Sequence, residues 1–271
     1  MSTFRPDTPV LNAPVSWCVL DFISDLHLKL TDGATFEAWK RYLADTPADA
    51  LFILGDLFEV WVGDDAADGP GFEQDCARIL SAASRRCAIH FMPGNRDFLL
   101  GKQFLHASGM TGLDDPTVLA FAGQRWLLSH GDALCLDDVP YQHFRRMVRD
   151  PAWQCDVLTR TLDERRALAQ HIREHGTRSV NNDATVYADV DPDMARQWLQ
   201  TAQAFTLIHG HTHRPGEHDL GSIAPDRRDG RDEAARLRRI VLSDWDVGAS
   251  PPRAQVLRMS ETRLRRVDLS A

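Results

Sequence analysis

An aspartate and a histidine stand two residues apart near the start of the chain, directly after a short apolar run. Asp25 and His27 follow the stretch 19–23, which has the length of a buried strand. Residues i and i+2 of an extended backbone point their side chains the same way, so this pair can reach one metal ion. An exposed turn with two polar residues would give the same short pattern. The rest of the chain decides between these two interpretations.

Four more apolar runs end in side chains that bind cations. The pairs of run and ligand are 50–54 with Asp56, 88–92 with Asn95, 125–128 with His130, and 205–208 with His211 and His213. Ligands of open α/β sheets bind at the carboxyl ends of the strands. Five such strand ends favour a metal centre over five unrelated turns.

Together these residues supply ligands for two ions. Asp25 and His27 can serve one ion, and a carboxylate such as Asp56 can bridge it to the next. The second ion would take Asn95, His130 and either His211 or His213. Carboxylate, amide and imidazole ligands suit manganese, iron or zinc better than a soft thiolate metal. Two divalent ions would leave the site about two units positive, so that it attracts phosphate and lowers the pKa of bound water.

The composition limits the class of protein. At 271 residues the chain can form one large α/β domain, or a domain that carries an insert. Its net charge of -8 and pI near 5.7 argue against a general nucleic-acid binder, which would show a basic face. Five scattered cysteines without a C-x-x-C pair predict neither a disulfide framework nor a zinc knuckle. A reduced, cytosolic setting fits this pattern best.

The patterning predicts a core with a helical insert. Residues 1–16 carry three prolines among polar residues and lack the apolar core of a signal peptide, so we expect a loose tail. Residues 17–136 and 201–271 form the predicted core, and residues 137–200 form the insert. No stretch approaches the roughly 18 apolar residues of a membrane-spanning helix, so membrane contact would be peripheral.

Within the core, helical spacing and strand-like runs alternate along the chain. The predicted elements besides the five runs above are helices at 36–43 and 72–83, a hairpin at 118–128, and closing antiparallel strands at 239–242, 254–258 and 263–269. The charged stretch 216–238 is predicted to be a connection without a further role.

The motifs, taken together, resemble the calcineurin-like metallophosphoesterases. In chain order they are D-x-H at Asp25, G-D at Gly55, G-N at Gly94, H-G at His130 and G-H-x-H at Gly210. Each is weak alone, but five in this order over about residues 18 to 270 are specific. The resemblance implies an α/β fold in which a two-layer β-sandwich is flanked by helices.

The resemblance also implies the ligands of two metals. One metal would be bound by Asp25, His27, Asp56 and His213, and the other by Asp56, Asn95, His130 and His211. The neighbouring polar residues have ordinary roles in this interpretation: His209 is packed in the core, and Asp97 and Asp132 orient loops or cap helices.

Arg96 departs from the broad family in an informative way. Many phosphomonoesterases of this family carry a histidine after the G-N motif, where it helps to protonate an alkoxide leaving group. Arginine gives up no proton usefully, but its planar fork binds two oxygens of a phosphate well. A phosphate leaving group needs no protonation because its pKa is low. Arg96 therefore indicates cleavage of a diphosphate.

Local stretches resemble one branch of the family, the UDP-2,3-diacylglucosamine diphosphatases of lipid A synthesis. These stretches are ILGDLFEVWVGDD, GNRDFLLGKQF, SHGDALCLDD and IHGHTHRP. The resemblance implies that water attacks the uridine-side phosphorus of UDP-2,3-diacylglucosamine and releases UMP and 2,3-diacylglucosamine 1-phosphate. It implies two divalent cations, most simply Mn²⁺, and a peripheral place on the cytoplasmic face of the inner membrane. It gives catalytic roles to Asp56, Asn95, Arg96 and His130, and substrate contacts to Asn95, Arg96, Asp138 and His211.

The insert allows two interpretations. Its helices have apolar faces that can pack on the body of the protein, or that can form a lid whose inner side holds two acyl chains. Arg145, Arg146 and Arg149 form a basic cluster that can meet anionic lipid.

Substrate contacts carried by the insert match only in part. Relatives of this branch place a serine, an asparagine and a lysine there. Asn181 matches the asparagine after a shift of one residue, but Asp183 or Ala184 stands where the lysine is expected. Arg178 can supply the missing cation. A solvated helix end would explain Arg178 and Asn181 equally well.

Two other classes of function remain as alternatives. A phosphodiesterase or phosphatase of the same fold would act on a soluble nucleotide or a phosphoprotein, and both the insert and Arg96 argue against it. A metal-free interaction scaffold on this fold would have lost ligands, whereas every ligand position of the five motifs is filled here. The oligomeric state does not follow from the sequence.

Overall fold

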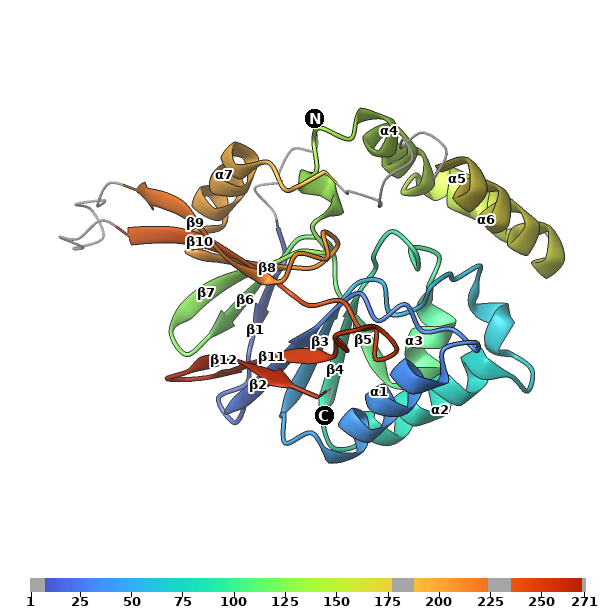
Figure 1. Ribbon diagram of the computed structural model, residues 1–271, viewed down its shortest axis with the longest axis horizontal. Coiled ribbons are helices and arrows are strands. Elements are labelled where there is room, and N and C mark those ends of the chain that lie inside the picture. The colour runs from blue at the N-terminus through green and yellow to red at the C-terminus, as the bar shows by residue number, and fades with distance from the viewer. Residues whose placement is uncertain (1–7, 177–187, 224–234, 270–271) are drawn as a thin grey trace.

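Two six-stranded β-sheets pack face to face in the computed structural model, which describes residues 8–176, 188–223 and 235–269 (Figure 1). One sheet has the order β12 (Leu264–Asp268), β11 (Gln255–Ser260), β2 (Val19–Ile23), β3 (Ala50–Leu54), β4 (Ala88–Met92) and β5 (Met110–Gly112). The other has the order β1 (Val10–Asn12), β6 (Thr117–Phe121), β7 (Gln124–Leu128), β8 (Thr206–His209), β10 (Ala235–Val241) and β9 (Gly216–Ile223). The predicted α/β sandwich is confirmed.

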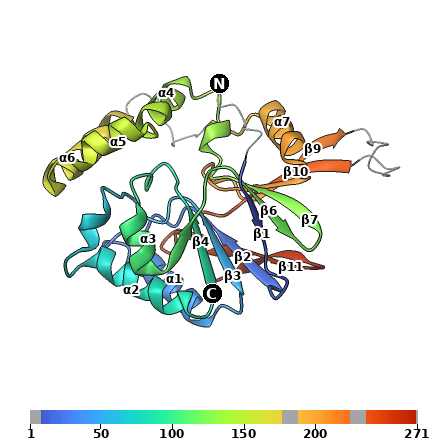
Figure 2. The same cartoon turned by 180° about the vertical axis from the view of Figure 1, so that it is seen from behind.

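Helices cover both outer faces of the sandwich. The helices are α1 (Gly33–Asp45), α2 (Phe72–Ser84), α3 (Lys102–Ser108), α4 (Val139–Val148), α5 (Pro151–Leu158), α6 (Leu162–Gly176) and α7 (Pro192–Ala202), with 3-10 turns at Asp64–Ala67 and Asp132–Leu134. Figure 2, seen from behind, shows α1, α2 and α3 beside the sheet of β2 to β5. In both views α4, α5 and α6 run across one end of the molecule.

The parallel strands β2, β3 and β4 alternate between two apolar layers. Every residue of β3 is buried, as expected for a strand that is covered on both faces. Its residues Phe52 and Leu54 face the other sheet, while Leu51 and Ile53 face α1 and α2. This alternation follows from the two-residue period of a strand. The alternation fixes the orientation of each strand, and with it the position of the loop that follows the strand.

The structure corrects three boundaries. Val10–Asn12 is not a loose tail, because it pairs in parallel with β6 and forms the edge strand of that sheet. Gly216–Ile223 is strand β9 rather than a plain connection: it pairs antiparallel with β10, and Leu220 is its buried side chain. Helix α7, assigned to the insert by its position in the sequence, packs Trp198 and Leu199 on the outer face of the core sheet.

The predicted closing strands are present as β10, β11 and β12. Strands β11 and β12 pair antiparallel, and β11 adds antiparallel to β2. Strand β10 pairs antiparallel with β9 but parallel with β8. Within the described residues no helix combines the length and the apolar character that crossing a bilayer requires.

Candidate metal centre

The predicted ligands meet where the carboxyl ends of strands from both sheets lie together. Asp25 and His27 follow β2, and Asp56 and Asn95 follow β3 and β4 in the same sheet. The other sheet supplies the remaining three ligands: His130 follows β7, and His211 and His213 follow β8. Two groups that could hold a metal ion form there. The site therefore spans the two sheets.

The first group contains Asp25, His27 and His213, whose ligand atoms all lie within 4.8 Å of one another. Nε2 of His27 is 3.3 Å from Nε2 of His213, and the same His213 nitrogen is 3.4 Å from Oδ1 of Asp25. Two imidazole nitrogens and a carboxylate oxygen thus converge on one point. This is three of the four ligands implied for the first metal.

The second group contains Asp25, Asp56 and His130, again within 4.8 Å. Nε2 of His130 lies 3.8 Å from Oδ2 of Asp56 and 2.9 Å from Oδ1 of Asn95. The same Asn95 oxygen is 2.9 Å from Nδ1 of His211. Asp25 is the residue that the two groups share, so the bridging role of Asp56 stays a prediction.

The donor set fits a divalent cation. Asp25 and Asp56 are both buried, and two carboxylates in one buried group need a positive charge between them. Burial would raise the pKa of Asp25, but the hydrogen bond and positive charge of His213 hold that pKa well below its usual range. Burial would lower the pKa of His130, yet the carboxylates of Asp56 and Asp132 raise that pKa to about 9. Asp25 therefore stays ionised, and the carboxylates around His130 favour positive charge at this place.

The backbone at the site is held in an unusual conformation. Asp25, His27, Asp56, His211 and His213 all have positive φ, between 48° and 67°. A residue with a side chain rarely adopts this region, and each instance costs on the order of 1–3 kcal/mol. Such conformations persist only where the surrounding structure imposes them, and they cluster at functional sites.

Glycines make room for the carboxylates. A Cβ on Gly94 would lie 2.1 Å from Oδ1 of Asp56 and 2.4 Å from its backbone nitrogen. A Cβ on Gly210 would lie 2.3 Å from Oδ2 of Asp25. The glycines of the G-N and G-H-x-H motifs are therefore required by close approach to the ligands.

Buried polar side chains orient the ligand loops, as expected of Asp97 and Asp132. Asp97 accepts hydrogen bonds from the backbone N–H groups of Gly94 and Leu57, both at 2.7 Å, and burial with the nearby charge of Asp56 raises its pKa to about 6. Asp132 accepts from the Tyr141 hydroxyl at 2.6 Å and from Nε of Arg145 at 2.9 Å. These contacts fix the loop after β4 and fasten α4 to the loop after β7.

The imidazoles have partners of their own. Nδ1 of His130 lies 2.9 Å from the Leu54 carbonyl oxygen and donates to it in the tautomer that leaves Nε2 free for a cation. His209 is fully buried, with Nδ1 2.9 Å from the Gly210 carbonyl and Nε2 3.4 Å from Arg239, and it belongs to neither metal group. Its predicted role as a packed histidine is confirmed.

The sequence did not reveal the role of Glu59. Its Oε2 lies 3.3 Å from Nδ1 of His27, and its Oε1 accepts a hydrogen bond from Arg173 on α6 at 2.8 Å. Burial would raise the pKa of Glu59, but His27 and the charges of Arg96 and Arg173 lower it to about 2. Leu28 and Phe58 form a parallel bridge, which brings the two loops side by side. The similar stretches DLHL and DLFE were the available signal for this pairing.

Two of the predicted substrate-contacting residues, Arg96 and Asp138, make hydrogen bonds within the protein. Arg96 is half-buried, and its backbone N–H donates to Oδ1 of Asp56 at 2.8 Å. Asp138 caps α4 and accepts from the backbone N–H of Tyr141 at 3.0 Å. Arg178 and Asn181 lie outside the described residues.

The insert packs on the body at several points. Trp153, Val157 and Leu168 pack against the core beside α1 to α3, which supports the packing interpretation for these residues. Contact of the cluster Arg145, Arg146 and Arg149 with anionic lipid stays a prediction, although two of the three arginines have partners within the protein. Arg145 donates to Asp132, and Arg149 donates to the carbonyls of Pro93 and Gly94 at 3.1 and 2.9 Å.

Known proteins that are similar to this chain belong to the phosphoesterase family that the motifs resemble. Residues 19–215 match the family model described as calcineurin-like phosphoesterase. The chain is 41% identical over 227 residues to the UDP-2,3-diacylglucosamine hydrolase of Stutzerimonas stutzeri, covering 83% of this chain and 90% of that protein. It is 45% identical over 207 residues to the enzyme of the same name from Chromobacterium violaceum, covering 73% and 84%. A solved archaeal phosphodiesterase aligns with 92% of this chain and 99% of its own, at 11% identity and a TM-score of 0.46.

Proposed function

The chain belongs to the calcineurin-like phosphoesterases, and from that premise we propose that it hydrolyses UDP-2,3-diacylglucosamine to UMP and 2,3-diacylglucosamine 1-phosphate. The observation that carries the proposal is the match to UDP-2,3-diacylglucosamine hydrolases at 41% and 45% identity over most of both chains. The convergence of Asp25, His27, Asp56, His130 and His213 at the meeting point of the two sheets supports a metal-dependent hydrolase.

The residues that would hold two divalent cations are Asp25, His27, Asp56 and His213 on one side, and Asp56, Asn95, His130 and His211 on the other. When bound, such cations supply positive charge that attracts a diphosphate and lowers the pKa of water to near neutrality. We propose Mn²⁺ for both positions, because oxygen and imidazole ligands suit it.

The residue at position 96 suits cleavage of the diphosphate bond. Arg96 stands beside the ligand Asn95 and can hold two phosphate oxygens with its planar guanidinium. Water attacks the uridine-side phosphorus, the bond from that phosphorus to the bridging oxygen breaks, and the sugar 1-phosphate leaves. A phosphate is stable as an anion, so the site needs no acid in the place of Arg96. Asn95 and His211, joined by their hydrogen bond, would contact the attacked phosphate.

We propose that the helices of the insert cover the lipid part of the substrate. Val139 and Met147 on α4 and Leu158 on α5 are exposed apolar side chains that could contact such a lipid. A substrate with a nucleotide head and two acyl chains lies at a membrane surface, so we place the protein peripherally on the cytoplasmic face of the inner membrane. Asp138 would contact the head group of this substrate.

The proposed reaction is tested with purified protein, Mn²⁺ and UDP-2,3-diacylglucosamine. We expect release of UMP, loss of release after chelation of the metal, and abolition of release by Asp56→Ala. In water enriched in ¹⁸O the label should appear in UMP, because the uridine-side phosphorus is attacked. Equal or better turnover of simple phosphomonoesters without UMP would instead identify a phosphatase of the same fold.

A further inference from the structure

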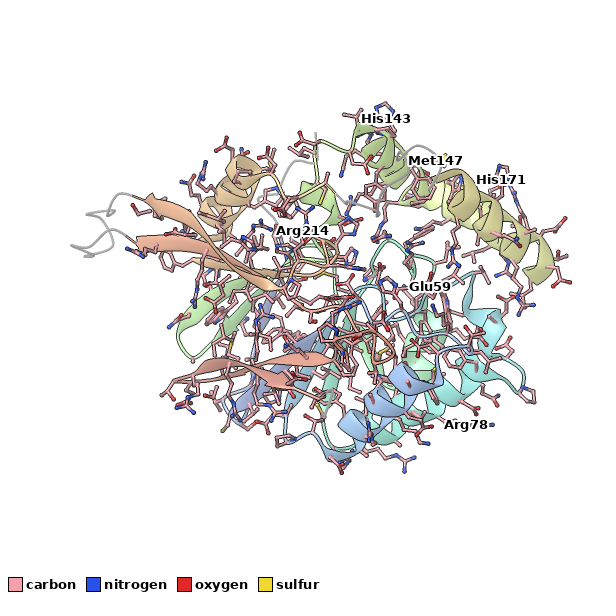
Figure 3. All side chains as sticks on the ribbon, in the orientation of Figure 1. Glu59, Arg78, His143, Met147, His171 and Arg214 are labelled. Carbon is pink, nitrogen blue, oxygen red and sulfur yellow. The ribbon has the colours of Figure 1, made fainter. Side chains whose placement is uncertain are left out.

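Glu59 connects a predicted metal ligand with the insert. One carboxylate oxygen, Oε2, lies 3.3 Å from Nδ1 of His27, and the other, Oε1, accepts from Nη2 of Arg173 at 2.8 Å. Arg173 lies 114 residues further along the chain, on α6. Figure 3 shows Glu59 between the loops at the strand ends and the helices of the insert. Each carboxylate oxygen therefore serves a different part of the molecule.

The contact between Glu59 and Nδ1 of His27 is an ion pair rather than an aligned hydrogen bond, and it favours the tautomer in which Nε2 is free to bind a cation. Nε2 of His27 faces Nε2 of His213 at 3.3 Å, inside the first metal group. For Nε2 to present a lone pair, the proton of a neutral imidazole must sit on Nδ1, where a carboxylate can accept it. A carboxylate behind a ligating histidine fixes the tautomer and the ring orientation.

The backbone holds Glu59 at this place. Its N–H donates to the Leu28 carbonyl at 3.1 Å, and the N–H of His27 donates to the Asp56 carbonyl at 3.0 Å, so the two loops are paired like strands. Arg173 also donates to the backbone carbonyl of Glu59 at 3.3 Å. The Glu59 side chain is 22% exposed and that of Arg173 is 43% exposed, so the ion pair is partly screened by water.

We propose that Glu59 is a positioning residue for His27, and that Arg173 holds the Glu59 carboxylate in place, so that cation affinity at this centre depends on α6. The inference rests on the metal centre proposed above. It assigns to the insert a second task besides covering substrate: it supports a ligand of the metal. Arg173 is one of two arginines that attach α6 to the body of the protein. The other, Arg165, donates to Asp65 and to the Val62 carbonyl and does not contact Glu59 in these bonds.

The test measures Mn²⁺ binding to metal-stripped full-length protein by calorimetry, without substrate. Glu59→Ala should weaken binding roughly 10- to 100-fold, the usual effect of removing a partner of a ligating histidine. Arg173→Met should weaken it about two- to fivefold, as expected for a partly exposed ion pair. Arg173→Lys should restore part of that loss because it keeps the charge. In the Glu59→Ala background, Arg173→Met should have no further effect.

Arg166→Met is the matched control, because Arg166 is an exposed arginine on α6 that pairs with Asp163. It should leave Mn²⁺ affinity unchanged, and all variants should melt at the same temperature as the unmodified protein in the absence of metal. Equal Mn²⁺ affinity of the unmodified protein, Glu59→Ala and Arg173→Met would overturn the inference while leaving the metal centre standing. Failure of the unmodified protein to bind Mn²⁺ would overturn both.

Discussion

Single residues at this site combine a chemical type that the sequence reveals with a backbone conformation that it conceals. Asp25 and His27 were predicted as ligands because they follow an apolar run, and the structure places them with His213 in one group. Their positive φ values could not be predicted, since neither residue is a glycine. Glu59 was missed for a related reason: its contact with His27 depends on the pairing of two loops, which only a comparison of the stretches DLHL and DLFE could have suggested.

Gly94→Ala should abolish UMP release and Mn²⁺ binding. The added methyl group would lie 2.1 Å from Oδ1 of Asp56 and 2.4 Å from its backbone nitrogen, so either the carboxylate or the loop must move. Binding is measured by calorimetry and release by chromatography of the nucleotide. Gly33→Ala is the control, because a Cβ there meets nothing within 4 Å. Unchanged Mn²⁺ affinity of Gly94→Ala would contradict the role assigned to this close approach.

At the scale of elements, strands buried on both faces were easier to predict than edge strands. The runs of β2, β3 and β4 are mostly apolar, because helices cover one side and the second sheet covers the other. Strands β1 and β9 have no such signal, since their pairing depends on partners elsewhere in the chain. Asp32 and Asp138 cap α1 and α4, because an aspartate that precedes a helix can accept from the N–H groups of its first turn.

His90 makes β4 sensitive to acid. Its ring stacks on Phe52 at 5.0 Å, neither ring nitrogen has a hydrogen-bond partner among the described residues, and burial lowers its pKa to about 4. Since the unfolded chain binds a proton near pH 6.5 and the folded chain does not, stability should fall as the pH drops from about 6.5 towards 4. Between pH 7 and pH 5, the lowered pKa of His90 should reduce the free energy of unfolding by about 2 kcal/mol.

His90→Leu should remove this part of the pH dependence of the free energy of unfolding, measured with urea at pH 7 and pH 5. His106→Gln, which changes an exposed histidine on α3, serves as the control. If the free energy of unfolding changes equally between pH 7 and pH 5 in His90→Leu and in the unmodified protein, His90 is not the source of the pH dependence.

At the scale of the whole molecule, the centre joins the two halves of the sandwich. Asp25 and Asp56 come from loops of one sheet, while His130 comes from a loop of the other. Bound Mn²⁺ should therefore stabilise the complete fold, by about 2.7 kcal/mol at a concentration one hundred times its dissociation constant. Thermal unfolding with Mn²⁺ and with a chelator measures this difference. Asp56→Ala should unfold at nearly the same temperature in both, and a metal-induced rise as large as in the unmodified protein would argue against its place in the centre.

The first described strand carries a practical consequence for anyone who shortens the chain. Val10 to Asn12 run alongside Val118 to Ala120, and the N–H of Ala13 extends that ladder to the Ala120 carbonyl. Trimming the proline-rich start up to residue 17 would strip β6 of its neighbour and leave a row of unsatisfied amides, which invites another molecule to dock there. Turbid or polydisperse preparations of such a shortened protein would then indicate that this edge strand is missing, even though every predicted metal ligand is still present.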